Sequence, residues 1–285
     1  MEKAMREYRL GLYEKSMPNS LIVAEKLRVA RRCGYDHLEL SIDETDEKLA
    51  RLDWTDGDIA DLQRAMADGG IRIRSICLSG HRKYPLGHPD PQVQARSLEI
   101  MEKAIALAEK LGIRIIQLAG YDVYYETGTE ETRANFARNL RKSVEMAARA
   151  GVILAFETME TDFMNTVGKA MDWVTRIESP YLQVYPDAGN ITNAAVAAGA
   201  SVIDDLETGR GHIAAVHMKE TVPGVYREVP YGMGHVDFPA IARKSMELGV
   251  RIYLAEFWYM GQENWEADIE ANCRFLRNIL DAAGV

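Results

Sequence analysis

The sequence predicts an α/β protein built as one (β/α)₈ TIM barrel over residues 1–285. Three observations indicate this fold. Eight short apolar runs alternate with longer segments of helical period, at a mean spacing of roughly 35 residues, as expected for repeated strand–helix units. The runs are almost continuously apolar, which is typical of parallel strands covered on both faces. The length of 285 residues also fits one barrel of about 250 residues with little left for a second domain.

The elements follow in order along the chain. The eight apolar runs predict strands at Arg9–Tyr13, His37–Ser41, Ile71–Leu78, Ile113–Leu118, Val152–Phe156, Leu182–Tyr185, Ile213–Met218 and Ile252–Ala255. Apolar residues three and four apart predict helices, most clearly at Pro91–Leu111, Thr129–Ala150 and Trp265–Ala283. Glycines such as Gly112 and Gly151 stand between a helix and the next strand, where a left-handed cap is favoured. An open doubly wound sheet is the rival fold, but no G-x-G-x-x-G follows an early strand.

Composition and charge exclude several classes of protein. The chain has 34 lysines and arginines against 43 aspartates and glutamates, a net charge of −9, which argues against a nucleic-acid partner. No apolar stretch is long enough to span a membrane, and the charged N-terminus is unlike a signal peptide. The three cysteines, Cys33, Cys77 and Cys273, have no paired spacing, so we expect reduced thiols in a cytoplasmic protein.

Four successive predicted strands end in a potential metal ligand. Strand five is followed by Glu157, strand six by Asp187 and strand eight by Glu256, while strand seven contains His217 near its end. The carboxyl ends of barrel strands share one rim, where function resides. Any one of these carboxylates could instead cap a helix or pair with a cation. Four in consecutive units predict a shared site for one divalent ion, Mn, Mg, Co or Zn.

Basic residues at the same rim are candidates to bind an anionic substrate group. His81, Arg82 and Lys83 follow strand three, Lys15 follows strand one, and Arg227 lies in the long segment after strand seven. Arginine and lysine suit such a role, with solvated surface charge as the alternative.

Other residues near the rim have plainer interpretations. Lys219 follows His217 by two residues and either points into the metal site or lies on the surface. His212, at the start of strand seven, is expected to be structural, and Asp237 to cap the next helix. Six aromatic side chains could line a sugar site, form a subunit contact or pack in the core: Trp54, Tyr121, Tyr124, Tyr125, Trp258 and Tyr259.

Several stretches give the chain a family resemblance. The most distinctive are CLSGHRKYPLG at 77–87 and IQLAGYDVYYE at 116–126, supported by VHMKETVPGVYREVPYGMGHVDF at 216–238. With these, the chain resembles the xylose-isomerase-like superfamily of metal-dependent TIM barrels. More narrowly it resembles the L-ribulose-5-phosphate 3-epimerases, also called L-xylulose-5-phosphate 3-epimerases, of pentose and ascorbate catabolism. The similar stretches span most of the chain.

The resemblance implies a carbohydrate 3-epimerase, an isomerase that inverts C3 of a 2-ketopentose 5-phosphate. Its metal ligands fall on Glu157, Asp187, His217 and Glu256. The two glutamates would be catalytic, one removing the C3 proton to give a cis-enediolate and the other returning a proton to the opposite face. The cation would polarise the C2 carbonyl. A homodimer is also implied by the resemblance.

Two departures bear on the substrate. Free-ketose 3-epimerases have a histidine where this chain has Asn190, and an arginine where it has Pro223. Both favour a phosphorylated substrate, with Asn190 and Lys219 as further substrate contacts. Alternatives are a 3-epimerase or an aldose–ketose isomerase acting on another sugar or sugar phosphate, including a hexulose-6-phosphate isomerase. A lyase with Lys219 as Schiff base, an abasic-site endonuclease and a non-catalytic sugar-binding protein are the other rivals.

Overall fold

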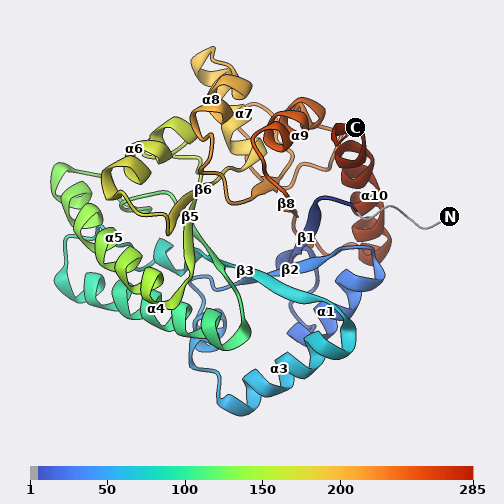
Figure 1. The fold of residues 1–285 in the computed structure, drawn as a ribbon, viewed down its shortest axis with the longest axis horizontal. Coiled ribbons are helices and arrows are strands. Elements are labelled where there is room, and N and C mark those ends of the chain that lie inside the picture. The colour runs from blue at the N-terminus through green and yellow to red at the C-terminus, as the bar shows by residue number, and fades with distance from the viewer. Residues whose placement is uncertain (1–5, 285) are drawn as a thin grey trace.

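The computed structural model describes residues 6–284 and contains eight parallel strands surrounded by helices (Figure 1). The TIM-barrel prediction is confirmed. The strands are β1 (Arg9–Tyr13), β2 (His37–Ser41), β3 (Arg72–Leu78), β4 (Ile115–Ala119), β5 (Ile153–Glu157), β6 (Leu182–Tyr185), β7 (Val216–Met218) and β8 (Ile252–Ala255).

The strands form one sheet in the order β6-β5-β4-β3-β2-β1-β8-β7. The two ends of this order, β6 and β7, are joined by isolated parallel bridges, Val184 with Ile213 and Asp187 with His217. Backbone hydrogen bonds complete the junction: Val184 N donates to His212 O at 2.8 Å, and His217 N donates to Pro186 O at 2.9 Å. The sheet therefore closes into a barrel, with a seam between β6 and β7.

Strand seven is shorter than the sequence indicates. The apolar run predicts it from Ile213, but the regular strand spans only Val216–Met218. Pro186, on the facing segment, has no N–H to donate, so the ladder between β6 and β7 is interrupted beside it. Ile213 still pairs with Val184, as one isolated bridge.

The helices lie outside the strands in Figure 1, and the predicted long helices are present. They are α1 (Val23–Arg32), α2 (Asp46–Leu49), α3 (Asp56–Gly69), α4 (Pro91–Leu111), α5 (Glu130–Ala150), α6 (Val167–Ile177), α7 (Ala188–Ala198), α8 (Val202–Thr208), α9 (Phe238–Glu247) and α10 (Trp265–Ala283), with 3₁₀ turns η1 (Glu14–Ser16), η2 (Ala50–Asp53) and η3 (Ser79–Arg82). Gly112 and Gly151 cap α4 and α5 with φ of 70° and 65°, a conformation that glycine adopts without strain.

The strands are buried on both faces, as their apolar sequences predict. Every residue of β2 and β4 is buried, and Leu154 and Phe156 of β5 have no exposed surface. Burying such a side chain contributes roughly 1.5–3 kcal/mol, so the barrel wall is a rigid platform for the loops at its rim. In the described part of the chain, no helix is long and apolar enough to cross a membrane.

Candidate active site and metal centre

The four side chains predicted as metal ligands converge at the carboxyl-end rim. Glu157, Asp187, His217 and Glu256 are all buried, and each offers one ligand atom within 4.8 Å of the others. His217 is central: its Nδ1 lies 3.2 Å from Glu157 Oε1, 3.0 Å from Glu256 Oε2 and 4.0 Å from Asp187 Oδ2.

Each of these side chains lies in a strand or within two residues of its end. Glu157 is the last residue of β5, His217 lies within β7, and Glu256 directly follows β8. Asp187 is the N-cap of α7, where its Oδ1 accepts a hydrogen bond from Asn190 N at 2.7 Å. Asp187 therefore caps α7 with Oδ1, as the alternative interpretation predicts, and its Oδ2 is still available to bind a metal ion.

The donor set fits a divalent cation. Within the residues described, Asp187 Oδ2 and Glu256 Oε2 are buried and accept no well-directed hydrogen bond, although Lys219 Nζ lies 3.1 Å from the first and His217 Nδ1 3.0 Å from the second. Burying carboxylate oxygens without hydrogen bonds lowers the stability of the fold unless a cation compensates their charge. Three carboxylates and one imidazole are ligands for Mn, Mg, Co or Zn, and do not select one of them.

Burial and mutual repulsion perturb the protonation of these groups. Burial raises the pKa of Asp187, and the neighbouring Glu256 carboxylate raises it further. Burial also tends to raise the pKa of Glu256, but His217 and Lys219 outweigh it and hold that pKa below its usual value. For His217, burial lowers the pKa, but Glu256 and Glu39 raise it well above 6.5. Perturbed groups clustered in a cleft are typical of functional sites.

A pocket opens above these side chains, and five of the seven predicted substrate residues line it. They are Lys15, Arg82, Asn190, Lys219 and Arg227. Glu157 and Glu256 also line this pocket, and Trp258 is the one of the six predicted aromatic side chains that does so. The pocket therefore combines carboxylates at its base with cationic groups around them.

The cations of this pocket differ in their existing partners. Lys15 pairs with Asp43 at 2.5 Å, and Arg227 pairs with Glu160 at 3.3 Å. Arg82 lies over the Tyr124 ring, 4.6 Å from its centroid, and in the described structure its buried Nε has no hydrogen-bond partner. Arg82 thus has donor capacity to spare for an anionic group.

His81 and Lys83 do not line the pocket, contrary to the interpretation of the S-G-H-R-K stretch as one cationic cluster. His81 is buried, with its Nε2 3.1 Å from Ser97 O of α4, and burial lowers its pKa to about 4. Lys83 is exposed and lies over the Tyr84 ring. The segment forms the 3₁₀ turn η3, in which residues three apart lie on one face, so Ser79 and Arg82 line the pocket and His81 points away from it.

Lys219 is buried rather than on the surface. Its Nζ donates to Asn190 Oδ1 at 2.8 Å and pairs with Asp187 at 3.1 Å. Asn190 in turn donates through Nδ2 to Thr158 O at 2.7 Å, which joins the residue after β5 to the first turn of α7. Lys219 and Asn190 are therefore held beside the proposed ligands by a connected set of polar contacts.

Polar residues at the site that the sequence analysis missed include Glu39, Gln117 and Glu160. Glu39 of β2 and Gln117 of β4 lie inside the barrel wall, where Glu39 contacts His217 and Gln117 donates to Glu157. Glu160 lies in the pocket after β5 and accepts from Tyr124 OH at 2.9 Å. A charged residue within an apolar strand, as in H-L-E-L-S, was the available signal for Glu39.

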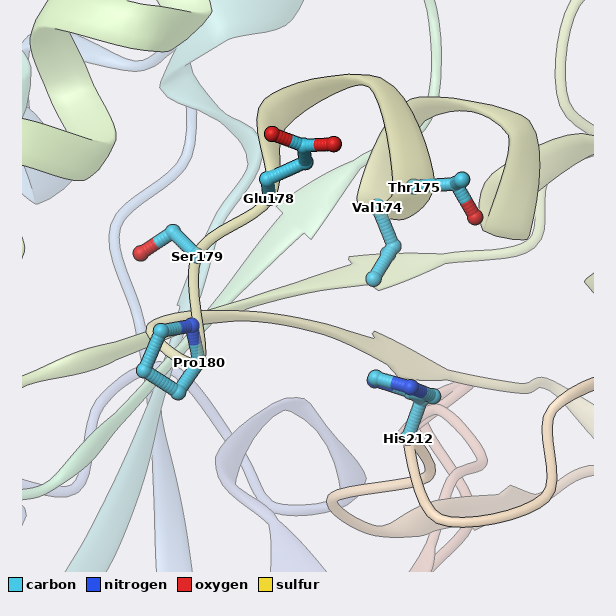
Figure 2. A pocket seen from close by; sticks show the side chains of 6 residues that line it. All are labelled: Val174, Thr175, Glu178, Ser179, Pro180 and His212. Carbon is cyan, nitrogen blue, oxygen red and sulfur yellow. The ribbon is translucent and has the colours of Figure 1, made fainter.

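His212 lies at the other end of the barrel, as predicted. It precedes β7 and lines a hollow with residues from the end of α6 and the turn before β6. Figure 2 shows the His212 ring and the Val174 side chain facing one another across this hollow. Asp237 accepts a hydrogen bond from Ala240 N at 2.9 Å, which confirms its role as the N-cap of α9.

Fold and site define a known class of barrel. The family model described as "Xylose isomerase-like TIM barrel" matches residues 27–279. The chain belongs to this family and, within it, to the family of the L-ribulose-5-phosphate 3-epimerases. Among the relatives that support the narrower assignment is L-ribulose-5-phosphate 3-epimerase UlaE of Salmonella paratyphi C (strain RKS4594), 44% identical over 277 residues, covering 97% of this chain and 96% of the relative.

Solved structures share the fold at lower sequence identity. D-psicose 3-epimerase from Clostridium cellulolyticum H10 matches with a TM-score of 0.79 at 16% identity, over 95% of this chain and 99% of that one. An L-ribulose 3-epimerase matches with a TM-score of 0.77 at 22% identity, over 97% of this chain and 96% of that one. The comparison supports the barrel architecture, and the 44% identical relative supports membership in an isomerase-class epimerase family.

Proposed function

We propose that this protein is a metal-dependent epimerase that interconverts L-ribulose 5-phosphate and L-xylulose 5-phosphate by inverting C3. One observation carries the proposal: Glu157 and Glu256 line the same pocket, and a carboxylate oxygen of each lies within 3.2 Å of His217 Nδ1. It is supported by the 44% identity to an L-ribulose-5-phosphate 3-epimerase. A divalent cation bound by Glu157, Asp187, His217 and Glu256 would supply electrophilic polarisation of the C2 carbonyl, which acidifies C3–H.

The two glutamates would move the proton. One carboxylate removes H⁺ from C3, and the electron pair of the C–H bond passes into the enediolate. The other, in its acid form, donates H⁺ to C3 from the opposite face. Before the next turnover in the same direction, the first glutamate releases its proton to solvent and the second takes one up. β6 and β7 separate the strands of Glu157 and Glu256 around the barrel, so the two carboxylates reach the pocket from different strands. Each positioned acid or base typically contributes about 10²–10⁴-fold.

Lys15, Arg82 and Arg227 would bind the phosphate. All three line the pocket together with the glutamates, and cationic side chains form strong, short hydrogen bonds with phosphate oxygens. Lys219 is better suited to orienting Asn190 and Asp187 than to Schiff-base chemistry. Its ion pair with Asp187 at 3.1 Å favours the ammonium form, which is not a nucleophile.

A substrate panel in deuterium oxide tests the proposal. The protein, supplied with Mn²⁺, is incubated with L-ribulose 5-phosphate, other ketose 5- and 6-phosphates and the corresponding free ketoses, and products are followed by ¹H NMR. We expect a C3 epimer with deuterium at C3, formed fastest from the 5-phosphate. An aldose product with deuterium at C1 or C2 would instead identify an isomerase. Equal rates for the free ketoses would contradict the assignment of a phosphorylated substrate.

A further inference from the structure

The two ring nitrogens of His217 face different surroundings. Nδ1 points to the three carboxylates of the proposed metal site, 3.0 Å from Glu256 Oε2 and 3.2 Å from Glu157 Oε1. Nε2 points away from them and lies 2.9 Å from Glu39 Oε1. A neutral imidazole has one N–H and one lone pair, so only the Nε2–H tautomer can present Nδ1 to a cation. The residue that contacts Nε2 therefore influences which ring nitrogen carries the proton and which one can bind a cation.

Glu39 is held in place from several strands. It lies on β2 with no exposed surface, and its Oε2 accepts hydrogen bonds from Ser75 Oγ of β3 at 2.6 Å and from Tyr185 OH of β6 at 3.3 Å. The Tyr185 ring also packs against the His217 ring, with centroids 4.6 Å apart. With His217 Nε2, three groups able to donate surround the carboxylate. Glu39 is thus oriented as an acceptor.

Glu39 does not reach the substrate pocket. It is not among the residues that line the pocket, and the imidazole of His217 separates it from Glu157 and Glu256. An additional buried carboxylate in an already acidic site is costly unless its interactions compensate for the lost hydration. Its three contacts supply that compensation, and the one with His217 connects it to the ligand set.

We infer that Glu39 is a positioning residue, which fixes His217 as the Nε2–H tautomer with Nδ1 directed at the bound cation. The inference rests on the metal site in the proposed function and assigns the nitrogen that binds. A carboxylate behind a histidine ligand sets the ring orientation and increases ligand basicity. Losing such a partner typically lowers metal affinity about 10–100-fold.

The first measurement needs no variant. The protein is loaded with Zn²⁺, a diamagnetic probe, and the histidine side chains are observed in a two-bond ¹H–¹⁵N correlation spectrum. We expect His217 to show a protonated Nε2 and a Zn²⁺-shifted Nδ1. The opposite pattern, with Nε2 bound and Nδ1 protonated, would overturn the inference.

The second measurement is the affinity for Mn²⁺ alone, by competition with a chromophoric chelator. Glu39→Gln keeps the shape but loses the charge, and Glu39→Leu removes the acceptor, so affinity should fall about 10-fold and about 100-fold respectively. Asp122→Asn is the matched control, because Asp122 is also buried and accepts from Thr132 Oγ1 at 2.5 Å but lies outside the pocket lining. Its Mn²⁺ affinity should equal that of the wild type even if its Tm falls.

The outcomes separate this inference from the metal site itself. Wild-type protein that binds neither Mn²⁺ nor Zn²⁺ would contradict both. Wild-type binding with Glu39→Gln and Glu39→Leu within twofold of it would overturn the role of Glu39 alone. If both variants fail to fold, Ser75→Ala carries the test, since it frees Glu39 by removing one hydrogen bond. An affinity loss of about 2–10-fold is then expected, and unchanged affinity counts against the inference.

Discussion

Asp187 and His217 are parallel bridge partners at the seam where β6 and β7 close the barrel. Their side chains also face one another, with His217 Nδ1 4.0 Å from Asp187 Oδ2. The two proposed ligands therefore lie at the seam between β6 and β7, which isolated bridges rather than a continuous ladder hold together. A cation bound by both side chains would cross-link the seam, so its binding should be visible as stability of the whole barrel.

Removing divalent cations with a chelator should lower the Tm, and Mn²⁺ should restore it. A ligand that binds only the folded state at 100 times its Kd adds about 2.7 kcal/mol, which raises the Tm of a large domain by several degrees. Differential scanning calorimetry measures the shift. Asp187→Asn is the control, because it keeps a cap for α7 but loses a charged ligand. An equal shift in that variant would show that Mn²⁺ acts elsewhere.

Arg227→Ala should raise the KM for the phosphorylated substrate and change kcat little. Arg227 lines the pocket beside Glu160, and a hydrogen bond to a charged group contributes about 1.5–3 kcal/mol, or roughly 10–100-fold. Steady-state kinetics with the 5-phosphate and the free ketose measures the effect. Lys83→Ala is the matched control, because Lys83 is exposed outside the pocket and its loss should leave KM unchanged. Equal losses for both substrates would argue against phosphate binding by Arg227.

Glu14→Gln should destabilise the fold strongly. Glu14 is fully buried, 3.4 Å from Lys26 Nζ and 3.7 Å from Lys48 Nζ, and it also pairs with Arg51. Removing its charge leaves three buried cations without their carboxylate, which typically costs about 3–5 kcal/mol.

Urea unfolding of Glu14→Gln gives the free energy of unfolding directly. Glu266→Gln, which breaks an exposed pair with Arg32 at 2.7 Å, is the control and should cost no more than about 1 kcal/mol. Similar losses for both variants would mean that the buried cluster around Glu14 contributes no more than a surface ion pair.

His37 should make the fold sensitive to acid. Its ring is fully buried against Gly11, and in the described structure neither ring nitrogen has a hydrogen-bond partner. Burial, with Arg74 nearby, lowers its pKa from 6.5 to about 3. Between pH 6.5 and about 3, His37 is protonated in the unfolded chain but neutral in the folded protein. The free energy of unfolding therefore keeps its full value, as far as His37 is concerned, above pH 6.5 and decreases as the pH falls toward 3. The loss is on the order of a few kcal/mol.

Unfolding free energies of wild type and His37→Leu, measured from pH 7 down to pH 4, isolate that contribution. The variant should lose less stability on acidification than the wild type, whatever its stability at pH 7. His88→Gln, at a partly exposed histidine, should follow the wild-type curve. Parallel curves for wild type and His37→Leu would exclude His37 as the source of acid sensitivity.

Local sequence patterns were sufficient for much of the fold and for the four proposed ligands. Glu157 and Glu256 end apolar runs, and a barrel brings such positions to one rim. The length of β7 was not predictable in this way. It depends on which segment pairs with it, and Pro186 on that segment lacks the N–H that a regular ladder requires.

The rest of the site could not be predicted, because the sequence does not show which way each side chain points. Glu39 and Gln117 lie within strands, and which strand residues face the barrel interior depends on the registers of neighbouring strands. His81 and Arg82 are adjacent in sequence, yet η3 turns His81 toward α4 and Arg82 toward the pocket. Composition and spacing define the residues available to a site, whereas tertiary packing decides which of them face it.

Deuterium exchange at C3 tests the central claim, that Glu157 and Glu256 act on opposite faces of one carbon. Wild-type protein in deuterium oxide should epimerise the ketose 5-phosphate and incorporate deuterium at C3. At saturating Mn²⁺, Glu157→Gln and Glu256→Gln should each stop epimerisation, with a loss of about 10²-fold or more. Each variant should also retain slow exchange from only one of the two epimers, and the epimer should differ between them. Full epimerisation by either variant at saturating Mn²⁺ would contradict the account.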